Sequence, residues 1–207
     1  MAVAVPTILV SQRVDAFPDI GEVRDALDQR LSRFLVTAGF LPVPVPNAIG
    51  DVLTIRQWID RVTPSGIVLS GGNDIGSAPE RDATEIELLR YAAEHRLPLL
   101  GICRGLQMLV HAHGGLIEQG EGHVRTSHEI TEFTNNGTVT RTVNSYHGNV
   151  IRSVPARLEV FATSADGTIE GVRHSDLPWE GWMWHPEREG TFNNADVIRL
   201  KELFRRD

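Results

Sequence analysis

The sequence predicts an α/β fold: a mostly parallel central sheet flanked by helices, with an additional antiparallel strand region in the second half. Three observations predict this fold. Apolar runs alternate with helical patterns over the first half of the chain, which requires crossover connections between parallel strands. The runs are apolar throughout, as in strands that are covered on both faces. Later segments instead alternate polar and apolar residues, as strands with one solvated face do.

Four strands and four helices are expected in the first half. The strands cover residues 7–10, 41–45, 67–69 and 99–102, and the helices cover roughly residues 22–38, 51–62, 83–95 and 105–113. The first helix is expected because apolar side chains from Val23 to Leu35 recur at helical spacing and Gly39 supplies a stop signal. Prolines in strand 41–45 indicate a sheet edge, because proline cannot donate a hydrogen bond to a neighbouring strand.

The second half is expected to hold strands at residues 129–133, 138–143, 158–163, 168–172 and 181–184, and a closing helix at about 194–204. Ala165, Asp166 and Gly167 form a hairpin turn signal between two of these strands. The chain has 207 residues and no internal repeat, which suits one compact domain over residues 1–207.

Composition limits the partners and the location. The formal net charge is -7, which argues against nucleic acid or an anionic membrane as the main partner. Cys103 is the only cysteine, so an intramolecular disulfide is impossible and a reducing compartment is expected. The apolar start of the chain lacks the basic region of a signal peptide, and no apolar run has the length of a membrane span. The expected location is the cytoplasm, and the oligomeric state stays open, a homodimer included.

Segment 99–107 is the most informative stretch, because an apolar strand leads into Gly101-Ile102-Cys103-Arg104-Gly105 and then into a helix. This is the pattern of a nucleophile elbow, with cysteine where a hydrolase has serine. Glycines are needed because side chains there would crowd the neighbouring chain at so sharp a turn. The turn presents the thiol at a helix N-terminus, which favours the thiolate. A buried structural cysteine is the alternative, but the pattern favours a catalytic one.

A thiol nucleophile needs a base, and the base needs an orienting group. His185 and Glu187 lie two residues apart at the end of an aromatic strand, and in extended chain such residues point to the same side. The pair is therefore expected to activate Cys103, although a surface histidine beside a glutamate is the alternative. For the other histidines a structural role is the better expectation. With one cysteine and no HExxH motif, neither a metal site nor a cofactor is expected.

A glycine-rich loop, Ser70-Gly71-Gly72-Asn73-Asp74, follows the buried strand 67–69. Acyl chemistry requires two donors on the developing oxyanion, and we expect them to be the backbone N–H groups of Gly72 and Arg104. The alternatives are a plain turn or a phosphate-binding loop. No Gly-Lys-Ser/Thr follows, which argues against a nucleotide P-loop.

The three motifs Leu-Ser-Gly-Gly-Asn-Asp, Gly-Ile-Cys-Arg-Gly-Leu-Gln and Trp-His-Pro-Glu occur in this order. Together they resemble the class I glutamine amidotransferases, specifically their γ-glutamyl hydrolase branch (peptidase C26). The resemblance covers about residues 7–204 and implies a flavodoxin-like fold. It implies a catalytic triad of Cys103, His185 and Glu187, a glutamyl thioester intermediate, and a small-molecule γ-glutamyl amide as substrate.

The same resemblance implies substrate contacts, which are expected from Gly71, Asn73, Gln107, Ser145, Tyr146, His147 and Arg125. A structural role remains the alternative for His147. Several stretches are most similar to hydrolases that remove glutamate from γ-glutamyl-CDP-amidate in capsule phosphoramidate biosynthesis, among them residues 10–13, 25–30, 122–125 and 184–189. A diphosphate would require cationic groups near the pocket, and Arg104, His123 and Arg125 are the candidates.

Three functions compete. A free-standing γ-glutamyl hydrolase releases glutamate without a partner protein. A glutaminase subunit delivers ammonia to a separate synthase and exposes an apolar docking face. A non-enzymatic redox sensor oxidises easily at Cys103 but has no need of His185 and Glu187. The ordered motifs favour the hydrolase.

Overall fold

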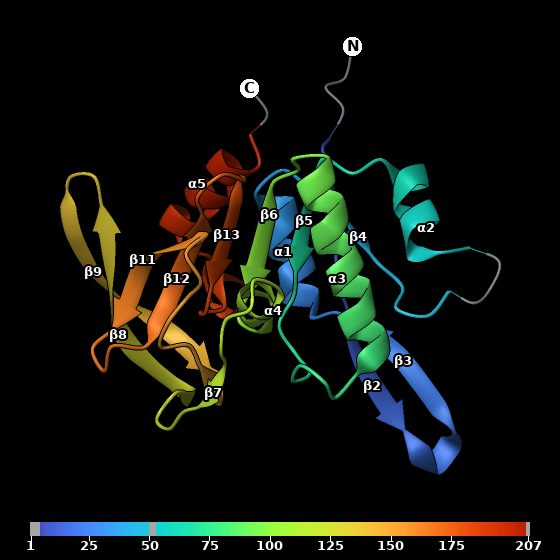
Figure 1. Ribbon diagram of the computed structural model, residues 1–207, viewed down its shortest axis with the longest axis horizontal. Helices are drawn as coiled ribbons and strands as arrows, with labels where there is room; N and C mark the ends of the chain where they lie inside the picture. Colours follow the sequence, from blue (N-terminus) through green and yellow to red (C-terminus); the bar gives the residue numbers. More distant parts are fainter. Residues whose placement is uncertain (1–4, 50–52, 206–207) are drawn as a thin grey trace.

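The computed structural model describes residues 5–49 and 53–205. Nine strands form one sheet in the order β4-β1-β5-β6-β13-β12-β11-β8-β9. The strands β4, β1, β5, β6 and β13 pair in parallel, whereas β13, β12, β11, β8 and β9 pair antiparallel. The α/β fold with an added antiparallel region is therefore confirmed, and Figure 1 shows the two regions side by side.

The parallel region contains β1 (Thr7–Val10), β4 (Leu41–Pro44), β5 (Gly66–Leu69), β6 (Leu99–Ile102) and β13 (Trp179–Trp182). The antiparallel region contains β8 (Val124–Thr134), β9 (Gly137–Tyr146), β11 (Leu158–Ser164) and β12 (Ile169–His174). Two small sheets pair β2 (Arg13–Phe17) with β3 (Glu22–Ala26), and β7 (Glu118–Gln119) with β10 (Asn149–Val150). Neither small sheet was expected from the sequence.

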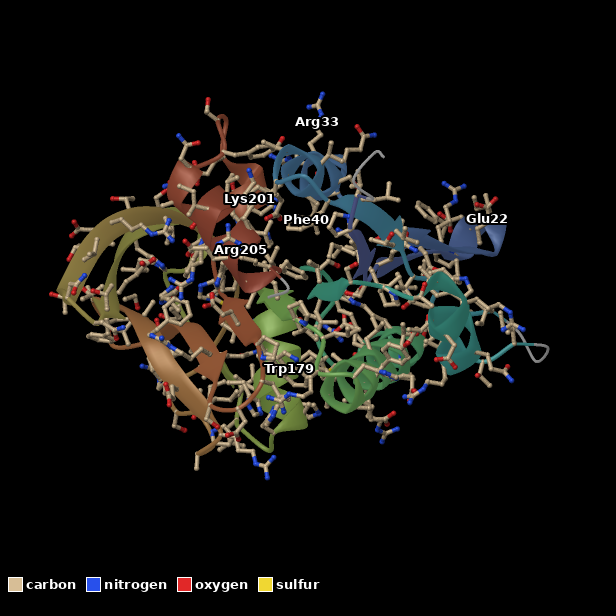
Figure 2. The ribbon with its side chains drawn as sticks, turned by 90° about the horizontal axis from the view of Figure 1, so that it is seen from above. Glu22, Arg33, Phe40, Trp179, Lys201 and Arg205 are labelled. Carbon is tan, nitrogen blue, oxygen red and sulfur yellow. The ribbon has the colours of Figure 1, made fainter. Side chains whose placement is uncertain are left out.

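The helices are α1 (Gln29–Thr37), α2 (Ile55–Val62), α3 (Pro79–Glu94), α4 (Arg104–Ala112) and α5 (Asn194–Leu203), with short 3-10 turns η1 (Pro18–Ile20) and η2 (Pro186–Arg188). Figures 1 and 2 show α1 and α5 on one face of the parallel sheet and α3 and α4 on the other. The strands β5 and β6 between these layers are buried at every residue. In the described part of the chain, no helix combines the length and apolar character that crossing a membrane requires.

The expected helix over residues 22–38 is wrong in its first third. Residues 22–26 form strand β3, which pairs with β2 in a hairpin that projects beyond the sheet (Figure 1). Helix α1 begins only after Asp28, whose carboxylate accepts a hydrogen bond from the Arg30 N–H at 2.9 Å. Val23 matched the helical spacing of the apolar side chains, yet it is 67% exposed. Spacing alone therefore included a residue that packs against no core.

Other boundaries differ by smaller amounts. Helix α3 begins at Pro79 instead of residue 83, because proline is well accommodated in a first helical turn. Helix α2 begins at Ile55 behind a capping box made by Thr54 and Gln57, while residues 51 and 52 of the expected helix lie outside the described residues. Strand β13 ends at Trp182, two residues before the expected end, and this matters for the site below. Strand β4 is the sheet edge, as its prolines predicted.

Candidate active site

Cys103 lies at the sharp turn between β6 and α4, with φ 50° and ψ -103°, a conformation that strains any residue other than glycine. A Cβ on Gly105 would lie 2.1 Å from the Leu69 carbonyl oxygen, and a Cβ on Gly101 would lie 2.5 Å from the Gly105 backbone. Side chains at either position are therefore excluded. The predicted elbow geometry is confirmed, and it holds the sulfur at the N-terminus of α4.

His185 and Glu187 lie beside this turn, and both are buried. Nδ1 of His185 is 2.7 Å from Oε1 of Glu187, so the imidazole donates this hydrogen bond to the carboxylate. From the sequence, an extended strand was expected to bring His185 and Glu187 together, and this is not how the contact arises. The strand has already ended, and Glu187 is in the 3-10 turn η2. Asn144 holds the segment in place: its amide accepts from the His185 N–H at 3.0 Å and donates to the His185 carbonyl at 2.8 Å.

The ionisation of His185 is strongly perturbed. Burial alone would lower the pKa of its imidazole, but the charges of Cys103 and Glu187 and hydrogen bonds to both outweigh burial and raise this pKa to about 9. The imidazolium form of His185 is thus favoured at neutral pH. An arrangement of this kind can supply a nucleophile and return a proton to a leaving group.

The glycine loop after β5 lies against the imidazole. A Cβ on Gly71 would be 2.7 Å from Cε1 of His185, so only glycine allows the ring this position. Gly72 has φ 128°, another conformation that favours glycine. Arg104 is the first residue of α4, where helix geometry leaves backbone N–H groups unpaired. The two N–H groups expected to stabilise an oxyanion therefore belong to segments that flank Cys103, and their role stays a prediction.

A buried network of charges that the sequence did not reveal supports this loop. Arg81 and Glu85 of α3 are both fully buried, and Nε of Arg81 is 3.0 Å from Oε1 of Glu85. Arg81 also donates to the carbonyl groups of Ser70 at 2.7 Å and Gly71 at 3.1 Å. Arg104 pairs with Glu85 and with Asp82. Burial lowers the pKa of both guanidinium groups, to about 10 for Arg81 and about 9 for Arg104, which leaves both charged at pH 7.

Arg104 and Asn73, two residues of the expected site, are held in place by polar contacts of this kind. The Arg104 side chain is 2% exposed and committed to carboxylates, so it is not free to bind a diphosphate. The Asn73 amide exchanges two hydrogen bonds of 2.8 Å with the backbone of Val14. Asn73 therefore ties the loop to strand β2 and positions it, and its contact with a substrate stays a prediction.

The structure separates the other expected substrate contacts into two groups. Tyr146 lies at the site: its ring is edge-on to the His185 imidazole, with 5.6 Å between centroids. Gln107 lies one turn of α4 beyond Cys103, and its amide donates to the Asn149 carbonyl at 3.3 Å. Ser145, by contrast, is fully buried and donates to the His123 carbonyl at 2.6 Å.

His123 and His147 are both buried, and a ring nitrogen of each lies near Oε1 of Glu170, at 3.9 Å and 3.6 Å. This is the structural alternative left open for His147, and the burial of His123 argues against its binding a diphosphate. Arg125 is exposed at an irregularity in β8, with φ 53°, and its contact with a substrate stays a prediction.

A cavity of about 280 Å³ opens beside the imidazole. Its lining includes Ser70, Gly71, Gly72, His185 and Glu187, together with Arg13, Asp15, Leu27, Asp28 and Arg188. The guanidinium of Arg188 lies 4.6 Å from the centre of the Tyr146 ring. Sequence reasoning missed Arg13 and Arg188 as site residues. Arg13 belongs to a hairpin that was not expected, but the segment Trp184-His185-Pro186-Glu187-Arg188 is contiguous with the motif.

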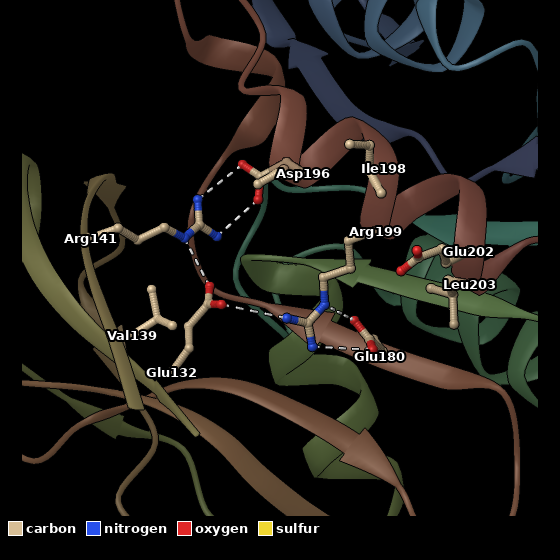
Figure 3. A pocket seen from close by; sticks show the side chains of 10 residues that line it. Glu132, Val139, Arg141, Glu180, Asp196, Ile198, Arg199, Glu202 and Leu203 are labelled. Atoms are coloured by element: carbon tan, nitrogen blue, oxygen red, sulfur yellow. Dashed lines mark hydrogen bonds and ion pairs between the residues drawn. The ribbon is translucent and has the colours of Figure 1, made fainter. Parts of the chain in front are cut away.

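A larger cavity, of about 700 Å³, lies between β9 and α5. Figure 3 shows that ion pairs cross it: Arg141 pairs with Asp196 and Glu132, and Arg199 pairs with Glu180 and Glu132. Both of its arginines are already paired with carboxylates, and it contains none of the catalytic candidates. The smaller cavity is therefore the candidate active site.

Comparison with known proteins shows which family the chain is similar to. The family model for class I glutamine amidotransferases matches residues 20–203. The chain is 35% identical to the γ-glutamyl-CDP-amidate hydrolase of Campylobacter jejuni, over 80% of this chain and 79% of that protein. It is 30% identical to the γ-glutamyl-γ-aminobutyrate hydrolase PuuD of Escherichia coli, over 89% of this chain and 85% of that protein. It is also 30% identical to a glutamine-hydrolysing GMP synthase subunit of Thermococcus kodakarensis, over 82% of this chain and 88% of that protein.

A solved structure shows the same fold. A glutamine amidotransferase of Thermotoga maritima superimposes with a TM-score of 0.65, covers 95% of this chain and 80% of its own, and is 16% identical. The family model and the named relatives confirm the motif resemblance noted in the sequence.

Proposed function

We propose, from the premise that this chain belongs to the class I glutamine amidotransferase family, that it hydrolyses a γ-glutamyl amide through Cys103. One observation carries the proposal. The buried His185–Glu187 pair, with 2.7 Å between Nδ1 and Oε1, lies beside a cysteine at a strained elbow. The named γ-glutamyl hydrolases among its relatives support the same bond as the target.

In the proposed reaction, the Cys103 thiolate attacks the γ-carbonyl carbon and forms a carbon–sulfur bond, while the carbonyl electrons move onto oxygen. The N–H groups of Gly72 and Arg104 stabilise this oxyanion. The oxyanion collapses, the carbon–nitrogen bond breaks, and His185 gives its proton to the departing nitrogen. The product is a glutamyl thioester.

Water then releases glutamate. His185, now neutral, removes a proton from water as the oxygen attacks the thioester carbon. The second oxyanion collapses, the carbon–sulfur bond breaks, and the thiolate–imidazolium pair is restored. Glu187 fixes the tautomer and orientation of the imidazole throughout. A reducing compartment such as the cytoplasm would keep the sulfur available as a thiolate.

The substrate that we propose carries an anionic leaving group such as a nucleotide amidate, as in the hydrolase of Campylobacter jejuni. Two guanidinium groups support this choice, because Arg13 and Arg188 line the cavity next to His185. The side chain of Arg13 is 51% exposed and pairs with Asp15 at 2.7 Å, so it can turn toward a phosphate. Guanidinium groups bind phosphate oxygens through paired N–H donors.

A panel of γ-glutamyl amides tests the proposal. Glutamine, γ-glutamyl peptides, γ-glutamyl polyamines and γ-glutamyl nucleotide amidates are incubated with the protein, and released glutamate is measured. We expect turnover of the amidate and its complete loss in Cys103→Ala at unchanged circular dichroism. Retained turnover in that variant would refute the nucleophile.

The leaving-group preference has its own test. Losing a charge-assisted hydrogen bond costs about 1.5–3 kcal/mol, so Arg13→Gln should raise KM for the amidate by about 10–100-fold. KM for glutamine should stay the same. Arg24→Gln is the matched control, because Arg24 lies in the same hairpin and forms its ion pair with Glu22 at the surface. Equal effects on both substrates would exclude Arg13 as a leaving-group contact.

The second candidate is a glutaminase subunit that delivers ammonia to a separate synthase. The similarity to the GMP synthase subunit of Thermococcus kodakarensis supports it. This alternative predicts that glutamine is the preferred amide and that turnover is weak until a synthase is added. Hydrolysis of glutamine but not of the amidate, together with faster turnover when a synthase is added, would favour it over the hydrolase.

A further inference from the structure

A cluster of histidines and one glutamate is buried in the antiparallel half of the chain, apart from the chemistry proposed above. His123 precedes β8, His128 lies within β8, His147 follows β9, and Glu170 is in β12. His123, His147 and Glu170 are 5%, 3% and 0% exposed. Titratable groups this deeply buried require partners, because an unpaired charge or polar atom is costly there.

The atoms that face one another in this cluster lack such partners. Among the described residues, no hydrogen bond is made by Nδ1 of His123, Nε2 of His128, Nε2 of His147 or either carboxylate oxygen of Glu170. Oε1 of Glu170 lies 3.6 Å from Nε2 of His147 and 3.9 Å from Nδ1 of His123. These separations exceed the usual hydrogen-bond range of about 2.7–3.2 Å.

The outer nitrogens of two histidines determine what the inner nitrogens can do. Nδ1 of His147 is 2.9 Å from the Asn149 carbonyl, which only accepts, so Nδ1 carries the proton. Nε2 of His123 is 3.0 Å from a carboxylate oxygen of Asp166, so Nε2 carries the proton there. In the neutral rings, the inner nitrogens are therefore lone pairs aimed at a carboxylate. Three hydrogen-bond acceptors then face one another without a donor between them. A bound cation would satisfy all three.

We propose that Nδ1 of His123, Nε2 of His147 and Oε1 of Glu170 bind a divalent transition-metal ion of the zinc class. One ligand atom from each of the three residues lies within 4.8 Å of the other two. A tetrahedral ion with bonds of about 2.0–2.1 Å separates its ligands by about 3.3–3.4 Å, so small movements close the site. His128 is the nearest further donor, with Nε2 3.4 Å from the other oxygen of Glu170.

The surroundings of the cluster suit such an ion. A histidine ligand commonly donates its second N–H to a carboxylate or a backbone carbonyl, as His123 and His147 do here. Spacing along the chain predicted no metal site, because the ligands come from three separate segments and form no motif. The ion would join the end of β9 to β12, whose Glu170 carbonyl accepts from the Met183 N–H at 2.8 Å, two residues before His185.

Metal binding by the intact chain tests the site without reference to activity. After treatment with a chelator and dialysis, zinc is titrated calorimetrically and cobalt is followed by its visible absorption. We expect one ion per chain. Glu170→Gln and His147→Asn should weaken binding at least about 100-fold, since both remove a ligand. Cys103→Ser and His95→Asn should bind as the unaltered chain does, because the first removes the catalytic sulfur and the second an exposed histidine outside the cluster.

Two further measurements apply if a ligand variant fails to fold. Asp166→Asn keeps the shape of the partially exposed partner of His123 but removes its charge, and it should weaken binding by about 10–100-fold. X-ray absorption of the unaltered zinc-loaded chain should show nitrogen and oxygen at about 2.0–2.1 Å and no sulfur. The proposal is overturned by an absence of saturable binding, by unchanged affinity in Glu170→Gln or Asp166→Asn, or by a sulfur ligand. None of these readouts depends on hydrolysis, so either proposal can fail alone.

Discussion

Replacing the charges around His185 one at a time should move its ionisation in a defined order. Burial lowers the pKa of the imidazole, whereas the charges of Cys103 and Glu187 and hydrogen bonds to both raise it, with Cys103 contributing more than Glu187. Cys103→Ser removes the larger raising influence and leaves a side chain of similar shape. Glu187→Gln removes the smaller one and keeps an amide at the carboxylate position.

The size of the effect follows from the pKa itself. The pKa of His185 rises from its ordinary value of 6.5 to about 9. Each pKa unit corresponds to about 1.4 kcal/mol, so the proton is held more tightly in the folded chain by roughly 3 kcal/mol. A group that binds its proton more tightly when folded adds full stability below its unfolded pKa, and loses it as the pH rises through the folded value. The contribution of His185 is thus complete below about pH 6.5 and lost through about pH 9.

Nuclear magnetic resonance of histidine-labelled protein measures this directly, with the His185 signal assigned through His185→Gln. We expect the unaltered chain to titrate at about pH 9. The pKa of His185 should fall in Glu187→Gln, fall further in Cys103→Ser, and drop below 6.5 in the double variant, where burial acts alone. The signal of the exposed His95 should not differ among the variants. A titration at or below pH 6.5 in the unaltered chain, or a larger fall in Glu187→Gln than in Cys103→Ser, would refute the reasoning.

Two further predictions concern the elbow and the charges behind it. Gly105→Ala places a Cβ 2.1 Å from the Leu69 carbonyl oxygen. The variant should lose about 1–3 kcal/mol of unfolding free energy, measured in urea, and most of its rate of glutamate release. Gly190→Ala, where a Cβ meets nothing within 4 Å, should change neither. Glu85→Gln removes the carboxylate that pairs with Arg81 and leaves Arg104 with Asp82 alone, and it should cost about 3–5 kcal/mol. Arg24→Gln breaks an exposed ion pair and should lower the unfolding free energy by less than about 1 kcal/mol. Equal losses of stability in Glu85→Gln and Arg24→Gln would contradict the role assigned to burial.

Local pattern predicted the central sheet well, because strands β1, β5 and β6 are short apolar runs that no other structure would bury as completely. It failed at residues 22–26. There the helical spacing of Val23 was accidental, and pairing with residues 13–17 decided the conformation. A short hairpin with many polar residues has no strong hydrophobic periodicity. Its strands can therefore be predicted only when the pairing of the two segments is known.

The site shows the same division. The pairing of His185 with Glu187 was expected, but for a different reason: the 3-10 turn η2 brings the two side chains together, not an extended strand. Asn144 fixes that turn from 41 positions earlier in the chain, which no local pattern reveals. Ser145 and Tyr146 are adjacent, yet one is fully buried and the other borders the imidazole, because neighbours on a strand point to opposite faces.

By itself, the sequence determined the elbow at Cys103, since two glycines around a cysteine between a strand and a helix leave the backbone one way to turn. It also determined the order of the three motifs, and through them the family. Only the tertiary structure decided what the polar side chains do. Arg104 and Asn73 became supports for the loop, and His147 joined Glu170. The physical reason is that the role of a polar group depends on burial and on its partners, and these partners come from distant parts of the chain.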